Sequence, residues 1–293
     1  MISSRVNRKQ FLILKHISEK SGLTEFWLGG SITYRDVAKL LGVDFETNDY
    51  DLVIIGDEKK FRSVLKTLRS NNFSIVREEP YYLKFNKVFQ IIAVKKLIHL
   101  DVAIVRDINY LGHFNWESIF WHFPSGQIYD PYNSIEALKK KKLIPVISVE
   151  GENPFILVSR FLNLCARFNI DFCKNKKLFS FSGSLSKKIK SWEHESYFHN
   201  VYAREHSYFN IFRAMIKSTN PRLFIQKMRK AGLLKAIFPE LNELIIPSSL
   251  NKELKGCQSV REVIHLIEQI LSAKPKKLSN FQDRIKIIHK RLT

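Results

Sequence analysis

Aspartates stand in predicted apolar strands, and two of them, Asp49 and Asp51, have the chemistry of a metal site. Asp49 and Asp51 open the run Asp-Tyr-Asp-Leu-Val-Ile-Ile, and Asp101 interrupts the run Leu-Asp-Val-Ala-Ile-Val. Alternate residues of a strand share a face, so Asp49 and Asp51 should lie roughly 6.6 Å apart along one side. Such carboxylates repel each other and resist burial unless a cation is shared between them. Because no His or Cys stands beside Asp49 and Asp51, their oxygen ligands favour Mg²⁺ over zinc.

A glycine turn precedes the acid pair. Gly29, Gly30 and Ser31 follow the apolar Phe-Trp-Leu at 26–28. The backbone N–H groups of such a turn can close around an anion. A short helix is predicted over 33–41, and its N-terminal N–H groups would point at the same anion. The two motifs together predict an active site for nucleotide phosphates held on metal ions.

Ordinary structural roles remain open for each motif. Asp49 could be a turn residue at a solvated strand end, and Gly29 and Gly30 could form a simple bend. Asp101 could lie at a strand edge, in water or paired with Arg106. The glycine turn just upstream of the acid pair favours the active-site interpretation.

Local patterns predict the elements that position these residues. Helical periodicity predicts a helix over 8–21 that stops at Gly22, and a helix capped by Asp57 that carries Phe61 and Leu68 on its apolar face. Strands are predicted at 25–28, from Asp49 onward, and at 73–76, 81–85, 88–93 and 98–105. A further helix is expected over 114–121, and a turn into an extended segment over 124–131.

The rest of the chain has the pattern of helices. They are predicted at 155–168, 185–191, 205–217, 222–230, 262–272 and 281–291. We therefore expect an α+β fold, in two domains or in one large domain, with strands and helices over residues 1–146 and helices alone over residues 147–293.

Charge is unevenly distributed along the chain. Of 293 residues, 1–138 carry 18 Lys and Arg against 16 Asp and Glu, whereas 139–293 carry 30 against 12. A strongly basic half is expected to bind a polyanion, most simply RNA. The alternative is a lysine-rich surface selected for solubility, or a codon bias that favours lysine.

Composition narrows the class of protein. A hydrophobic content of 45% with 26% charged residues is typical of a globular protein. Cys165, Cys173 and Cys257 are widely spaced and form no C-x-x-C, so we expect reduced thiols and no zinc site. We find neither a signal peptide nor an apolar run of the roughly 20 residues needed to span a bilayer. A cytoplasmic protein without a membrane partner is the expectation.

In their order along the chain, these motifs resemble the class II tRNA nucleotidyltransferase and bacterial poly(A) polymerase family of the polymerase-β-like nucleotidyltransferase superfamily. That family has Leu-x-Gly-Gly-x-Val-Arg-Asp-x-Leu-Leu-Gly followed by Asp-x-Asp. The matching residues here are Leu28-Gly29-Gly30, Arg35-Asp36, Leu40-Leu41-Gly42 and Asp49-x-Asp51. Asp101 resembles the family's third acid, and similarity at 125–132 and 231–241 extends the resemblance from residue 8 to about 245.

The resemblance implies a fold and a set of site residues. It implies a nucleotidyltransferase head over 1–146 and a helical, RNA-binding neck and body over 147–293. It implies that Asp49, Asp51 and Asp101 are catalytic and hold Mg²⁺. The implied nucleotide contacts in the head are Gly29, Gly30, Ser31, Arg35, Asp36 and Arg106.

Two family motifs are altered in this chain. The family's Arg-Arg-Asp-x-Thr-x-Asn, which holds the ribose and triphosphate, is Leu-Gly-His-Phe-Asn-Trp-Glu at 111–117. The family's Glu-Asp-x-x-Arg, which contacts the incoming base, begins here with Glu152 and Asn153 and has Ile156 in place of its Arg. We expect Glu152 and Asn153 to contact the nucleotide, with Arg160 replacing the lost Arg, and the family's CCA specificity does not carry over.

The expected function is template-independent transfer of nucleotides from ATP, CTP or both to the 3′ end of tRNA or another small RNA. Two alternatives remain open. The first is nucleotide transfer to a protein hydroxyl, which the altered base-reading motif permits. The second is a catalytically inactive RNA-binding module that has kept the fold.

Overall fold

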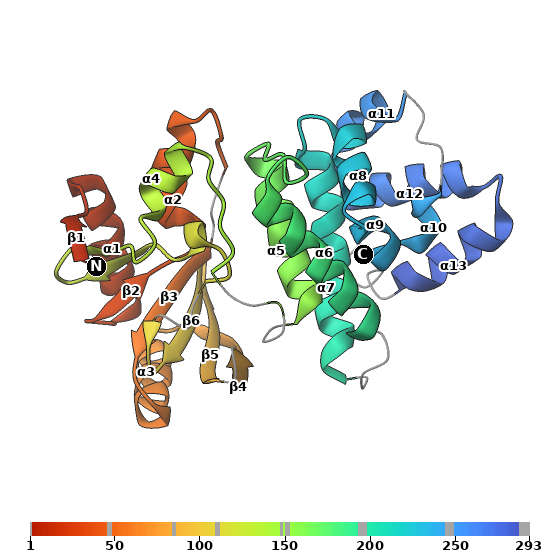
Figure 1. Cartoon of the computed structure of the whole chain (residues 1–293). Coiled ribbons are helices and arrows are strands. Elements are labelled where there is room, and N and C mark those ends of the chain that lie inside the picture. Colours follow the sequence, from red (N-terminus) through yellow and green to blue (C-terminus); the bar gives the residue numbers. More distant parts are fainter. Residues whose placement is uncertain are drawn as a thin grey trace. The chain divides into compact units, whose positions relative to one another are not determined.

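The computed structural model describes residues 2–45, 49–83, 86–108, 112–146, 149, 153–192, 198–243 and 249–286. The chain divides into two compact units, Met1–Ile147 and Ser148–Thr293. Figure 1 shows a sheet with helices in the first unit and helices in the second. The described fold is therefore α+β.

One mixed sheet organises the first unit. Its strands are β1 (Ile2–Arg5), β2 (Phe26–Leu28), β3 (Asp49–Ile55), β4 (Ser74–Leu83), β5 (Asn86–Lys95), β6 (Ile98–Val105), β7 (Phe120–Phe123) and β8 (Gln127–Tyr129). Their order across the sheet is β1-β8-β7-β2-β3-β6-β5-β4. The central strands β3 and β6 run parallel, whereas β2 pairs antiparallel with β3, and β5 with β6.

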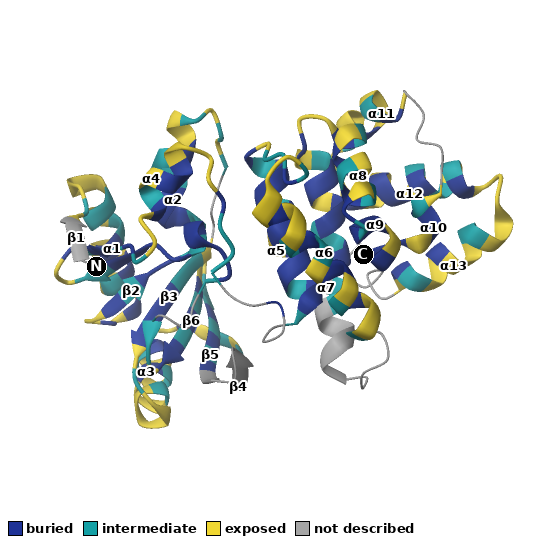
Figure 2. Ribbon diagram, viewed as in Figure 1, coloured by how far each residue is buried: buried dark blue, intermediate teal, exposed yellow. Residues whose placement is uncertain are grey.

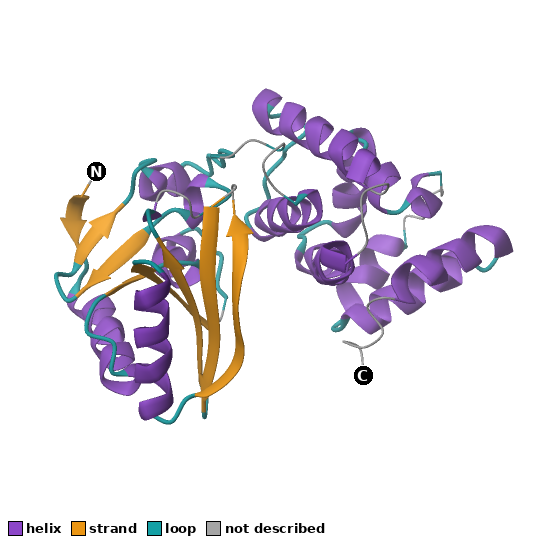
Figure 3. Cartoon of the chain, turned by 90° about the horizontal axis from the view of Figure 1, so that it is seen from below, coloured by secondary structure: helices purple, strands orange, loops and turns teal. Residues whose placement is uncertain are grey.

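Two helices cover one face of this sheet. The helices of the first unit are α1 (Arg8–Ser21), α2 (Ser31–Leu40), α3 (Glu58–Ser70), the 3₁₀ turn η2 (Asn115–Glu117) and α4 (Ser134–Lys139). Phe11 of α1 contacts Phe123, and Phe61 of α3 stacks on Phe89, so both helices lie on the sheet face that buries Leu52 and Ile54 (Figure 3). The face that these two helices cover is the main core of the unit.

The opposite face of the central strands is only partly buried. The residues of β3, β5 and β6 that point to it alternate with the core residues, and they include Asp51, Gln90, Ile92 and Asp101. A small apolar cluster of Val53, Val105 and Phe120 covers its middle. Beside this cluster, the same face carries the half-buried polar side chains of Asp51, Gln90 and Asp101.

The second unit contains only helices among the residues that the structure describes. These are α5 (Pro154–Arg167), α6 (Lys176–Trp192), α7 (Phe198–Lys217), α8 (Pro221–Lys230), α9 (Leu233–Ile237), α10 (Pro239–Asn242), α11 (Leu250–Gly256), α12 (Val260–Leu271) and α13 (Pro275–Ile285). Helix α5 is buried along most of its length against α6 and α7 (Figure 2). Phe238, between α9 and α10, stacks on Phe212 of α7, and both rings meet Phe281 of α13 edge-on.

Several elements predicted from local signals are confirmed. Helix α1 ends at Gly22, which adopts a left-handed conformation with φ +74°. Helix α3 is capped by Asp57, whose carboxylate accepts hydrogen bonds from the N–H groups of Lys59 and Lys60. Strands β2, β3 and β6 and helix α5 also form where they were predicted.

Two predictions fail. The helix expected over 114–121 is wrong, because only η2 is helical and Phe120 already begins β7. Trp121 pairs with Leu28 of β2, so sheet pairing of β-favouring aromatic residues prevails over a helical pattern. The strands expected at 73–76 and 81–85 are one strand, β4, which runs through Pro80. Proline is tolerated there because β4 lies at the sheet edge.

Candidate active site

Asp51 and Asp101 are direct neighbours across the central parallel strands. The register of β3 and β6 pairs Asp51 with Asp101. Register partners of a parallel pair project from the same face, and neighbouring strands lie about 4.8 Å apart. Both residues are half-buried on the face opposite α1 and α3. The two carboxyl groups therefore lie side by side on an incompletely covered surface.

The glycine turn lies directly against Asp51. The N–H of Gly29 donates to the backbone oxygen of Asp51 at 2.8 Å. A Cβ built on Gly30 would lie 1.7 Å from Oδ2 of Asp51, and Gly30 has φ +68° and ψ −160°, which only glycine adopts readily. A Cβ on Gly29 would come within 2.9 Å of the Phe120 ring. Both glycines are therefore required for the turn to approach the acid pair.

Helix α2 begins at this turn. Its first residue is Ser31, and no side chain caps its N-terminus at Gly30. The N–H groups at a helix start carry partial positive charge and favour an anion. Arg35 and Asp36 lie one turn further along α2 and are half-buried. The structure thus brings the turn, the helix start and the acid pair together.

A residue that the sequence interpretation missed contacts Asp101. The Gln90 amide Nε2 donates to both carboxylate oxygens of Asp101, at 2.8 and 3.0 Å. Gln90 is opposite Ala103 in the pairing of β5 and β6, so it shares the face of Asp101. An amide donor of this kind orients a carboxylate. The signal was present in the sequence as one polar residue in the apolar run Val-Phe-Gln-Ile-Ile-Ala.

The third predicted acid, Asp49, is set apart by exposure. Asp49 is exposed at the first position of β3 and is opposite His99 in the register with β6. Among the residues that the structure describes, no three His, Cys, Asp or Glu side chains are grouped so that they could hold a metal ion. The three-carboxylate metal site therefore stays a prediction, and the juxtaposed residues are Asp51 and Asp101.

The donor chemistry of this pair fits Mg²⁺ in one particular way. Mg²⁺ in nucleotide enzymes keeps several waters and is bound by one or two carboxylates together with substrate phosphates. Asp51 and Asp101 supply two carboxylates, and the backbone of the glycine turn lies against the Asp51 carboxylate. A metal held jointly by these two residues and by a triphosphate is compatible with this arrangement.

The remaining predicted contacts are dispersed. Arg106 follows β6 and is exposed. Asn153 caps α5, where its Oδ1 accepts a hydrogen bond from the N–H of Phe155 at 3.0 Å. Arg160 is exposed on α5 in the second unit, and Glu152 lies outside the described residues. A nucleotide contact from Asn153 or Arg160 stays a prediction.

The segment at the position of the family's ribose-binding motif has structural contacts. The buried Asn115 donates to the backbone oxygen of Lys142 and accepts from the N–H of Ile144. The Glu117 carboxylate accepts from the N–H groups of His113 and Phe114. These two polar side chains hold the chain around η2, which explains their presence without a nucleotide.

Comparison with known proteins adds no family to these observations. A scan against models of protein families finds no match for this chain. A search of the described helices finds none that is both long and apolar enough to cross a membrane.

Proposed function

We propose that this chain is a metal-dependent, template-independent nucleotidyltransferase. It transfers nucleotides from ATP, CTP or both to the 3′ end of tRNA or another small RNA and releases pyrophosphate. One observation carries the proposal: Asp51 and Asp101 are register partners on adjacent parallel strands, beside a diglycine turn that begins a helix. The finer assignment of the first unit as a nucleotidyltransferase head and the second as a neck and body is part of this proposal.

Each residue of the site has a role in this reaction. Asp51 and Asp101 bind Mg²⁺, with Asp49 at the exposed end of the strand as a further ligand. When held there, Mg²⁺ would stabilise negative charge on the phosphates and on the oxygen of the acceptor hydroxyl. Gln90 positions Asp101 through its two hydrogen bonds. No covalent intermediate with the protein is required.

The phosphates are bound by the turn and the helix that follows it. Charge develops on the leaving pyrophosphate, and backbone N–H groups fixed in advance stabilise it at little reorganisation cost. Gly30 and Ser31 supply these N–H groups, because the N–H of Gly29 is held by the backbone oxygen of Asp51, and Arg35 on α2 adds a cation. Asp36 and Arg106 make further contacts with the nucleotide.

The acceptor is RNA because of the charge distribution. Residues 139–293 carry 30 Lys and Arg against 12 Asp and Glu, so this half attracts a polyanion. A nucleotidyltransferase that lacks a template must hold its acceptor through contacts outside the catalytic pair, and a basic helical half can supply them.

A second candidate is a catalytically inactive RNA-binding module. It is favoured by the lack of a three-residue metal group among the described residues and by the use of Asn153 as a helix cap. Nucleotide transfer to a protein hydroxyl is the third candidate, which the altered base-reading motif permits.

One labelling experiment separates these functions. The full chain is incubated with Mg²⁺, each α-labelled nucleoside triphosphate in turn, total small RNA and a protein extract, beside Asp51→Asn and Asp101→Asn. We expect label on RNA, reduced more than about 100-fold in both variants, because each removes a metal-binding carboxylate. Label on protein would favour the third function. RNA binding without any transfer would overturn the proposal and favour the second.

A further inference from the structure

A pocket in the second unit lies between α7 and the start of α12. Its volume is about 510 Å³, and its lining includes Phe209, Arg213 and Lys217 of α7 and Ser259 and Arg261 at the start of α12. The three α7 residues recur at intervals of four, so they share one face of that helix. The volume is in the range of pockets that hold ligands.

The wall of this pocket is positively charged. It carries Arg213, Lys217 and Arg261, and none of the described residues that line it is an Asp or a Glu. The Arg213 guanidinium lies 5.8 Å from the centroid of the Phe209 ring. A guanidinium near an aromatic face gains a cation–π attraction, and its planar fork of N–H donors suits a phosphate.

The pKa of Lys217 is lowered in this pocket. Although the residue as a whole is exposed, partial burial of its amine lowers the pKa of Lys217, and Arg213 and Arg167 add to this, so that the pKa is about 8. Arg167 is the last residue of α5. Neighbouring like charges disfavour the ammonium form, and a bound anion would relieve that repulsion.

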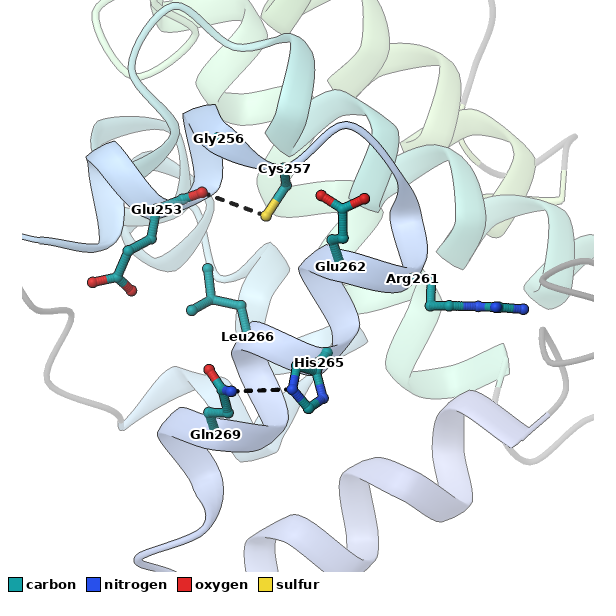
Figure 4. Close-up of a pocket in the computed structure, with 8 residues that line it drawn as sticks. All are labelled: Glu253, Gly256, Cys257, Arg261, Glu262, His265, Leu266 and Gln269. Atoms are coloured by element: carbon teal, nitrogen blue, oxygen red, sulfur yellow. Dashed lines mark hydrogen bonds between the residues drawn. The ribbon is translucent and has the colours of Figure 1, made fainter.

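The carboxylate that follows Arg261 in sequence has other partners. Glu262 accepts hydrogen bonds from the N–H of Gln258 at 3.0 Å and from the Ser259 hydroxyl at 2.8 Å. It lines a neighbouring pocket with Cys257 and His265, and there the Arg261 side chain extends away from Cys257 and Gln269 (Figure 4). Glu262 therefore fixes the loop residues that lead into α12.

We propose that the pocket between α7 and α12 binds a backbone phosphate of the RNA, held by Arg213, Lys217 and Arg261. The proposal names the part of the basic half that grips the acceptor, and it therefore rests on the proposed function. Two guanidinium groups and one ammonium group around a single pocket can all bind the oxygens of one phosphate. An acidic protein would instead offer carboxylates that are separated from each other, so RNA is the better match.

Equilibrium binding of a labelled small RNA, without nucleoside triphosphate, tests the pocket in the full chain. In the double variant Arg213→Gln/Arg261→Gln we expect an affinity about 10-fold or more lower, because charge-assisted hydrogen bonds are lost. The slope of log affinity against log salt should fall by about 1 for each phosphate contact removed. The control is Lys187→Gln/Lys190→Gln, which removes the same charge from exposed positions on α6. Thermal unfolding checks that both proteins fold.

The pH dependence of binding provides a second readout. Below about pH 8 the Lys217 amine is protonated and binds phosphate, and above that value it loses its charge. Affinity for RNA should therefore fall as the pH rises through about 8. The groups around the amine, Arg213, Arg167 and Arg261, keep their charge throughout this range. In Lys217→Arg the fall should disappear, because an arginine stays charged.

Several results would overturn the proposal. These are equal losses of affinity in the pocket and α6 double variants, competition by polyglutamate as strong as that by unlabelled RNA, an unchanged pH profile in Lys217→Arg, or no RNA binding by the wild-type chain. Binding by Asp51→Asn separates this test from the catalytic one. If that variant and the wild type bind RNA through the pocket but neither transfers label, the pocket stands and the proposed transfer falls.

Discussion

At the scale of single residues, the approach of Asp51 to the glycine turn depends on the absence of a side chain at Gly30. In Gly30→Ala the new methyl group would overlap Oδ2 of Asp51, and the backbone would occupy a conformation reserved for glycine. We expect a loss of about 1 to 3 kcal/mol in the free energy of unfolding, and loss of nucleotide transfer because the Asp51 carboxylate must turn away. Thermal or urea unfolding and the transfer assay measure the two effects.

Gly42 provides the matched control for this substitution. It also has a positive φ, +74°, but a Cβ there would meet no atom within 4 Å. Gly42→Ala should therefore cost about 1 to 2 kcal/mol of stability and leave transfer intact. Equal losses of transfer in both variants would show that backbone strain alone, and not the contact with Asp51, explains the effect.

Gln90 is the second residue on which a prediction depends. Gln90→Leu keeps the size of the side chain but removes the donor to Asp101. We expect transfer to fall about 10- to 100-fold, as for other residues that orient a metal-binding carboxylate, and the Mg²⁺ concentration needed for half-maximal rate to rise. If the rate falls while the Mg²⁺ requirement is unchanged, Gln90 does not act through Asp101.

At the scale of elements, Asn153 has a demonstrated role as a cap. Asn153→Ala should lower the free energy of unfolding by about 1 kcal/mol, whereas Asn153→Ser should keep it within a few tenths because serine caps as well as asparagine. If capping is the whole role, Asn153→Ser also transfers nucleotides normally. A stable Asn153→Ser protein with a raised KM for the nucleoside triphosphate would instead favour the nucleotide contact predicted from the sequence.

The elements that the sequence predicted well are those with local signals. Helix α1 has an apolar stripe and a terminal glycine, and helix α3 has a capping aspartate. Residues within or next to each helix therefore determine where it begins or ends. Helix α6 is much longer than the predicted 185–191, because Ser182 and Ser186 occupy buried positions on its inner face and so interrupt the apolar pattern. The sequence predicted a helix at β7 because the strand conformation there depends on pairing with β2, which is distant in sequence.

At the scale of the whole molecule, the candidate site depends on a register that no local pattern contains. The sequence indicated that Asp51 and Asp101 were unusual, but their juxtaposition follows from parallel pairing of two strands separated by α3 and a hairpin. Strand order and register are non-local, so they could be expected only from the family resemblance. The hydrogen bond from Gln90 depends on the same register.

The two units divide the proposed work between them. The first carries the acid pair and the glycine turn with a nearly balanced charge, and the basic half carries the cationic pocket between α7 and α12. Variants in one unit should therefore affect one step: Asp51→Asn should abolish transfer with RNA affinity kept, and Arg213→Gln/Arg261→Gln should weaken RNA binding with transfer restored at saturating RNA.

The most direct measurement of the central claim is anomalous scattering from Mn²⁺, used in place of Mg²⁺, in crystals grown with a non-hydrolysable nucleoside triphosphate. The account predicts an anomalous peak between the carboxylates of Asp51 and Asp101, with the triphosphate against Gly29 and Gly30, and no such peak in Asp51→Asn. A triphosphate bound elsewhere, or wild-type crystals without Mn²⁺ at this pair, would contradict it.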